Sequence, residues 1–162
     1  MLTALLLSIV WAVMAPLLVR GKGRAAGWVL ALWPAALFAW FATYAPAIGS
    51  GAVVRETIAW VPSLGVEASF VLDGLSLVFV LLITGLGAVI TVYAGRYLEG
   101  HRDLGRFFLT FLAFMSAMLG VVLADNLLLL FVFWEATSLC SYLLVGFKHE
   151  KEGARTSALQ AL

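Results

Sequence analysis

Long apolar stretches separated by short polar connections make up most of the hydrophobic pattern of this chain. A helix needs about 20 consecutive apolar residues to cross the hydrocarbon core of a bilayer. Five stretches qualify, and a sixth begins near Ala154. The sequence therefore predicts an all-α fold, a polytopic transmembrane helix bundle forming a single membrane domain over residues 1–162. The predicted spans are residues 2–19, 25–47, 74–94, 106–124 and 126–147.

The longest connection, residues 48–73, mixes β-branched residues with a Pro-Ser-Leu-Gly turn signal at residues 62–65. This combination is typical of a β-hairpin, so we predict a small hairpin on the outer face. Asp73 ends this connection, directly before the third span. Its carboxylate is placed to accept hydrogen bonds from free N–H groups of the first helical turn. A direct role of Asp73 in transport is the alternative.

Composition supports a membrane protein. The chain is 64% hydrophobic and 12% charged, whereas a soluble domain carries about 25% charged residues. A soluble fold of this size cannot bury so much apolar surface, which makes the lipid bilayer the expected surroundings. The chain has no long Lys and Arg run, which excludes a nucleic-acid partner. One cysteine, Cys140, excludes a disulfide framework and a CxxC metal site, and we predict a non-enzyme without cofactor or metal.

The positive charges predict the orientation, because short cytoplasmic loops are enriched in Lys and Arg. Nine of the ten basic residues fall on alternate connections, and Arg55 is the exception. This pattern predicts an N-terminus outside the cell and a tail inside after the fifth span. The nine residues are Arg20, Lys22, Arg24, Arg96, Arg102, Arg106, Lys148, Lys151 and Arg155.

Glu135 stands out because it lies inside an apolar span, whereas most acidic residues lie in connections or at span ends. It is nine positions into the fifth span, about 13 Å from the outer end at about 1.5 Å rise per residue. An ionisable group at this depth costs several kcal/mol unless it is paired, hydrated or protonated. We therefore predict a buried carboxylate on a proton or ion pathway, and a hydrogen bond to another helix is the structural alternative.

Polar residues follow Glu135 on the same helix. Ser138 and Tyr142 share its face at spacings of three and seven residues, and they offer hydrogen bonds or hold water. Thr137 and Ser141 form a second polar row beside them. We predict that these four residues line the pathway.

Two weaker candidates lie outside the spans. Asp125 is at the predicted outer mouth of the fifth helix, next to Asn126, where it either caps that helix or gathers cations. His101 lies in a basic cytoplasmic connection, where it either ends a proton path or is a solvated loop residue.

The segment around Glu135 resembles the fifth helix of antiporter-like membrane subunits. These are the large A subunits of Mrp-type multisubunit Na+/H+ antiporters and the proton-pumping subunits of respiratory complex I. The resemblance covers roughly residues 70–162, and the Mrp A subunits match it best. It rests on Trp134-Glu135-x-Thr137-Ser138, Asp125-Asn126, Leu72-Asp73-Gly74-Leu75-Ser76 and the tail Ala154-Arg155-x-Ser157-Ala158-Leu159-Gln160-Ala161-Leu162.

The resemblance implies a function. Subunits of this family exchange Na+ for H+, driven by the proton-motive force, in a hetero-oligomeric complex of membrane subunits in a bacterial or archaeal plasma membrane. Glu135 matches the family's essential glutamate, which works with a lysine on a later helix. An apolar helix does not naturally end at Leu162, so we expect this chain to be the N-terminal part of a longer one.

Two alternatives remain. The first is a proton-translocating subunit of a redox-driven complex, either complex I-like or a membrane-bound hydrogenase relative. Ala136, Thr137 and Ser138 depart from the Gly-rich stretch that complex I members tend to have here, which favours the antiporter. The second is a non-transporting assembly or scaffold subunit, in which Glu135 only forms interhelical hydrogen bonds.

Overall fold

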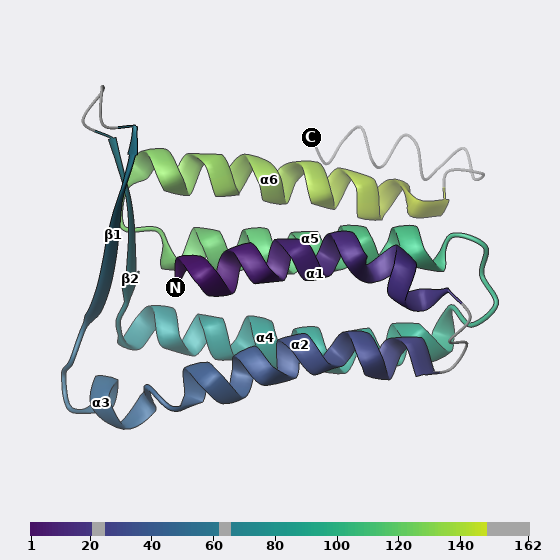
Figure 1. Cartoon of the computed structure of the whole chain (residues 1–162), viewed down its shortest axis with the longest axis horizontal. Helices are drawn as coiled ribbons and strands as arrows, with labels where there is room; N and C mark the ends of the chain where they lie inside the picture. The colour runs from purple at the N-terminus through teal and green to yellow at the C-terminus, as the bar shows by residue number, and fades with distance from the viewer. Residues whose placement is uncertain (21–24, 62–65, 149–162) are drawn as a thin grey trace.

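The computed structural model describes residues 1–20, 25–61 and 66–148. Figure 1 shows long helices lying side by side, with a pair of strands across one end of the bundle. The turn signal at residues 62–65 and the start of a sixth span near Ala154 lie outside the described residues.

Five helices are long and apolar enough to cross a membrane. A helix satisfies its backbone hydrogen bonds internally, which a spanning segment in lipid requires. The predicted helical bundle of about five spans is therefore confirmed. The helices are α1 (Leu2–Val19), α2 (Ala25–Ala42), α4 (Gly74–Tyr97), α5 (Leu104–Leu123) and α6 (Leu127–Val145), and α6 continues into the short 3₁₀ helix η2 (Gly146–Lys148).

The second apolar stretch is shorter as a helix than its hydrophobicity suggests. The helix α2 ends at Ala42, and a separate short helix, α3 (Ala45–Gly49), follows after a turn. Pro46 explains the break, because a proline has no N–H to donate and its ring clashes with the carbonyl four residues earlier. The predicted span over residues 25–47 is thus interrupted before Pro46. The other helix ends differ from the predicted ones by at most three residues.

The strands β1 (Val54–Val61) and β2 (Val66–Leu72) form an antiparallel two-stranded sheet. This sheet is an addition to the all-α class, and it lies in the connection where the sequence predicts a hairpin. In Figure 1 it runs across the ends of the long helices. Phe70 and Leu72 are buried against the bundle, and the N-terminal ammonium group of Met1 pairs with Glu56 on β1. The hairpin is therefore packed onto the helices.

The helices pack in pairs. The main contacts are those of α2 with α4, of α1 with α5, and of α5 with α6. The first pair approaches closely at Gly27 and Gly95, where a Cβ on either residue would overlap the backbone of the other. Small residues allow such approaches in lipid. The core lies between these pairs, around Phe108 and Leu112 of α5.

Candidate functional site

The helix that carries Glu135 begins at a side-chain cap. The Asn126 side-chain oxygen accepts a hydrogen bond from the Leu129 N–H at 2.8 Å, which satisfies one of the free donors of the first turn. The Asn126 amide donates to the Glu67 carbonyl at 2.8 Å and to the Ser69 hydroxyl at 3.0 Å. One side chain thus starts α6 and ties its outset to β2.

Asp125 has a different role from the predicted cap. Its carboxylate accepts a hydrogen bond from Arg55 Nη1 of β1 at 2.7 Å, and its backbone N–H donates to the Ser69 carbonyl. The interpretation of Asp125 as the helix cap is therefore wrong, because the neighbouring Asn126 fills that position. The interpretation as a residue that gathers cations stays a prediction, and the Arg55 charge beside the carboxylate weakens it.

Glu135 lies near the middle of α6. It is eight residues after Leu127 and ten before Val145, which places it about 12 Å and about 15 Å from the two helix ends at about 1.5 Å per residue. The side chain is exposed in this chain, so the expectation that it is buried is wrong for the described residues. The reason is that α6 packs mainly on α5, and Glu135 lies on another side of the helix.

An uncovered face of α6 surrounds the carboxylate. Phe131, Val132 and Leu139, the predicted neighbours of Glu135, are all exposed. Among residues 1–20, 25–61 and 66–148, no side chain forms a hydrogen bond or ion pair with the Glu135 carboxylate. We call the face formed by Leu128, Phe131, Val132, Glu135 and Leu139 the open face of α6.

The opposite side of α6 is tightly packed. Leu129 is the buried residue of this helix, and the Phe133 ring lies directly against Gly120 of α5, where an added Cβ would overlap the ring. The close contact fixes the rotation of α6 about its own axis. It therefore also fixes the direction of the open face.

The predicted polar neighbours of Glu135 are half-buried. The hydroxyl groups of Thr137 and Ser138 donate to the Trp134 carbonyl, at 2.6 Å and 3.3 Å respectively. Such bonds are common for Ser and Thr inside helices, and they leave the oxygen lone pairs free to accept from water or from a partner. Tyr142 and Ser141 are placed one turn further along the helix. All four stay candidates for the pathway.

Asp73 and His101 lie away from Glu135. Asp73 is the N-cap of α4 in a capping box with Ser76. Hydrogen bonds from the Ser76 backbone and hydroxyl hold the pKa of the Asp73 carboxyl below its usual range. The capping interpretation therefore matches the contacts of Asp73. His101 is in the connection between α4 and α5, where Nδ1 accepts from the Asp103 N–H at 3.2 Å and the ring lies 5.4 Å from that of Phe147.

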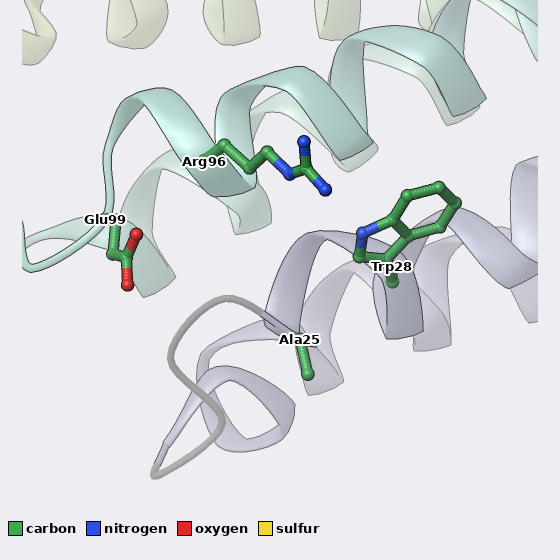
Figure 2. Close-up of a pocket in the computed structure, with 4 residues that line it drawn as sticks. All are labelled: Ala25, Trp28, Arg96 and Glu99. Atoms are coloured by element: carbon green, nitrogen blue, oxygen red, sulfur yellow. The ribbon is translucent and has the colours of Figure 1, made fainter.

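A polar hollow at the other end of the bundle was not predicted from the sequence. It measures about 610 Å³ and lies between the start of α2 and the end of α4. Figure 2 shows the Arg96 guanidinium directed toward the Trp28 indole and away from Glu99, with Ala25 at the rim. No group of three His, Cys, Asp or Glu side chains in the described part of the chain could hold a metal ion.

Two family models match the chain. The first describes the N-terminus of chain 5 of NADH-ubiquinone oxidoreductase (complex I) and matches residues 59–108. The second describes the transmembrane region of NADH:quinone oxidoreductase and Mrp antiporter subunits and matches residues 124–162. The second match contains all of α6, and the first contains all of α4.

Curated relatives match almost the whole chain. It is 41% identical over 160 residues to the A1 subunit of the Na+/H+ antiporter of Staphylococcus haemolyticus, covering 98% of this chain and 20% of that protein. It is 44% identical over 137 residues to the corresponding A-type antiporter protein of Alkalihalophilus pseudofirmus, covering 84% of this chain and 17% of that protein. The chain belongs to the family of antiporter-like membrane subunits. It spans about a fifth of the length of the curated relatives it matches.

Solved structures share the fold of this antiporter-like chain. A chain of the Mrp complex from Dietzia sp. DQ12-45-1b superimposes with a TM-score of 0.79 at 36% identity, over 97% of this chain and 17% of that one. The membrane-bound sulfane sulfur reductase, an archaeal respiratory membrane complex, gives a TM-score of 0.74 at 22% identity, over 97% of this chain and 24% of that one. This second likeness shows the fold alone. Together with the five apolar helices, the matches make the chain a multi-pass membrane protein.

Proposed function

We propose that this chain is part of one subunit of a multisubunit Na+/H+ antiporter in a bacterial plasma membrane. In this proposal the proton-motive force drives Na+ exchange, and Glu135 takes up and releases the proton near the middle of the membrane. The relatives named as Na+/H+ antiporter subunits support the activity, and the chain similar to this one in the Dietzia Mrp complex supports an assembly with other membrane subunits.

One observation carries the role of Glu135: a carboxylate in mid-span lies on the open face of α6 rather than against α5. A carboxylate facing lipid tails is costly, so this face needs a polar partner or water. Another segment or subunit that covers the face provides the first, and a hydrated path provides the second. A cation that approaches the carboxylate favours the charged form, and its withdrawal favours protonation. Alternation between these two states moves a proton.

The charges at the two ends of the bundle support an N-terminus outside the cell. Arg20, Arg96, Arg102 and Arg106 lie at the end where α1 and α4 finish and α5 begins. At the hairpin end, Arg55 is paired with Asp125. The basic end is the cytoplasmic one if the usual bias of Lys and Arg holds. Residues 48–73 and Asp125 then face the outside.

A redox-driven proton-translocating subunit is the second candidate. The match to a complex I family model supports it. The two candidates share Glu135 and differ in energy source, because an antiporter works on an imposed ion gradient alone. A scaffold subunit is the third candidate, in which the open face of α6 only binds a neighbouring helix.

The test is the substitution Glu135→Gln in the complete transporter. Exchange is measured in everted membrane vesicles as the alkalinisation caused by adding Na+ to vesicles with a preformed pH gradient and no respiratory substrate. Gln keeps the size of Glu and part of its hydrogen bonding but does not titrate. We expect loss of exchange in this variant and partial activity in Glu135→Asp, which still carries a carboxyl group.

The matched control is Glu67→Gln, which removes an exposed carboxylate from β2, outside α6. We expect near-normal exchange in this variant, with normal assembly of all variants checked by immunoblot of the purified complex. Full exchange by Glu135→Gln would overturn the role of Glu135. Exchange that requires an electron donor in the unmodified protein would favour the redox-driven candidate instead.

A further inference from the structure

An apolar groove continues from the polar hollow along the outer side of α2 and α4. The groove measures about 590 Å³ and shares Trp28 and Arg96 with the hollow. It is therefore apolar along most of its length and polar at one end, and that end lies at the basic end of the bundle. The residues that line it are Trp28, Ala31, Leu32, Ala35, Ala88, Val89, Val92, Tyr93 and Arg96.

The side-chain sizes explain why a groove forms here. The helices α2 and α4 cross closely at Gly27 and Gly95, so both helices contribute to one continuous surface. Among the lining residues, Ala31 and Ala35 of α2 and Ala88 of α4 are small, whereas Leu32 and Tyr93 are large and exposed. The alanines leave the space, and the large side chains rise on either side of it.

The polar end of the groove offers hydrogen-bond donors to an anion. The Arg96 guanidinium is always charged and binds phosphate oxygens in a fork geometry. Trp28 is exposed beside it, and its indole carries an N–H donor. Figure 2 shows the two side chains facing one another across the hollow, with the Glu99 carboxylate on the far side of Arg96. Trp and Tyr at such positions are typical of the headgroup level of a membrane.

We propose that this groove binds one anionic phospholipid of the adjacent membrane leaflet. An acyl chain lies along Ala31, Ala35 and Ala88, and the headgroup phosphate lies in the hollow beside Arg96 and Trp28. Basic pockets between transmembrane helices bind anionic headgroups by the same combination of forces. The charge of Arg96 selects a lipid with net negative charge over a zwitterionic one, whose ammonium group the arginine repels.

The lipid source fits the site better than a free phosphate ion. The groove is longer than the polar hollow and is lined by apolar side chains, which give an inorganic ion nothing to contact. A phosphate attached to an acyl chain uses both parts at once. The proposal does not depend on the transport role of Glu135, which lies on a different helix and away from these residues.

The experiment uses site-specific photo-crosslinking in the complete protein. Leu32, an exposed wall residue of the groove, is replaced by p-benzoylphenylalanine. The protein is placed in nanodiscs with equal amounts of dioleoyl phosphatidylglycerol and dioleoyl phosphatidylcholine and irradiated. Mass spectrometry of the crosslinked peptide gives the ratio of the two lipids. We expect a ratio about tenfold in favour of phosphatidylglycerol, the size that one charge-assisted hydrogen-bonded contact supplies.

Two variants separate the parts of the site. Arg96→Gln removes the headgroup contact, and Ala35→Phe fills the groove without a change of charge. In each we expect the ratio to fall toward the equal composition of the nanodisc. The matched control is Arg102→Gln, which removes the same charge from an exposed arginine at the same end of the bundle but outside the hollow, and it should leave the ratio unchanged.

Several outcomes overturn the proposal. An equal ratio in the unmodified background means that the groove holds ordinary boundary lipid. Equal losses in Arg96→Gln and Arg102→Gln mean that only the general positive charge attracts the lipid. A fall of the ratio on addition of inorganic phosphate at constant ionic strength assigns the hollow to the free ion. A crosslink to a peptide from a neighbouring protein of the complex makes the groove a protein contact.

Discussion

The helices α5 and α6 lie against one another, yet their environments differ greatly. Ten of the twenty residues of α5 are buried, whereas Leu129 is the one buried residue among the nineteen of α6. Both helices are apolar enough to span a membrane. The difference arises because α5 contacts α1, α4 and α6, while α6 packs mainly on α5. The ionisable Glu135 belongs to the helix with the less occupied surface.

This contrast separates a packing helix from one that presents chemistry. In lipid, an apolar side chain on the surface costs little, so α6 can leave most of its surface uncovered by this chain. A helix fixed on one side by Phe133 and Gly120 holds its other sides in a defined direction. The open face of α6 is thereby available to a further segment, a further subunit or water.

The largest effect on stability is expected in the core. Leu112 of α5 is buried, so Leu112→Ala leaves a cavity and should lower the free energy of unfolding by about 2 kcal/mol or more. Leu139→Ala on the open face of α6 should cost less than about 1 kcal/mol, because a hydrated path beside Glu135 leaves Leu139 fewer packing contacts. Unfolding of the complete protein in mixed SDS micelles, followed by circular dichroism, measures both.

Equal losses for the two leucine variants would break the contrast, because they would show that protein packs the open face as tightly as the core. A large loss for Leu139→Ala together with full transport by Glu135→Gln would favour a scaffold role for α6.

The next effect is expected at the contact between α5 and α6. Gly120→Ala places a Cβ inside the Phe133 ring, so it should cost about 1–3 kcal/mol through overpacking, although alanine favours a helix more than glycine does. Thermal unfolding of the purified protein measures the loss, and exchange activity should fall with it because α6 shifts or rotates.

Gly74→Ala is the matched control, since an added Cβ there meets no atom within 4 Å. We expect it to be neutral or slightly stabilising. A double variant with Phe133→Ala should regain much of the loss of Gly120→Ala, and additive losses instead would show that the two residues do not interact.

The smallest effect is expected at the helix starts. Asn126→Ala removes the cap of α6 and its bonds to β2, and it should cost about 1–2 kcal/mol. Asn126→Asp keeps an oxygen for the Leu129 N–H but loses the amide donor, so it should recover part of the loss. Urea or thermal unfolding of the complete protein gives the differences.

Asp103→Ala is the comparison for α5, because Asp103 occupies the N-cap position without a side-chain cap bond. We expect a change within about 0.5 kcal/mol. A loss for Asp103→Ala as large as that for Asn126→Ala would mean that the side-chain cap contributes nothing particular to α6.

The hydrophobic pattern predicted most of the fold. It located the five spans within a few residues, and it missed the break before Pro46 because apolarity continues across that proline. The turn signal and β-branched residues indicated the hairpin, since strand propensity is a local property. The pairing of Arg55 with Asp125 was not visible in the sequence, because these residues are 70 positions apart.

The candidate site divides in the same way. Sequence reasoning found Glu135 from its depth in a span, and it found the capping role of Asp73 as one of two alternatives. It considered Asp125 rather than Asn126 for the cap of α6, because both residue types favour that position and only the path of the backbone decides between them. The hollow between Trp28 and Arg96 joins two helices and gave no local signal.

By itself, the sequence determined that this chain spans a membrane and that one carboxylate lies in the middle of a span. Those conclusions depend on length, composition and position along one helix, which are local quantities. Only the tertiary structure decided which side of α6 meets α5, and therefore that Glu135 lies away from the core. The physical reason is that an apolar side chain is accepted by lipid and by protein alike, so apolarity alone does not reveal which face of a transmembrane helix is packed.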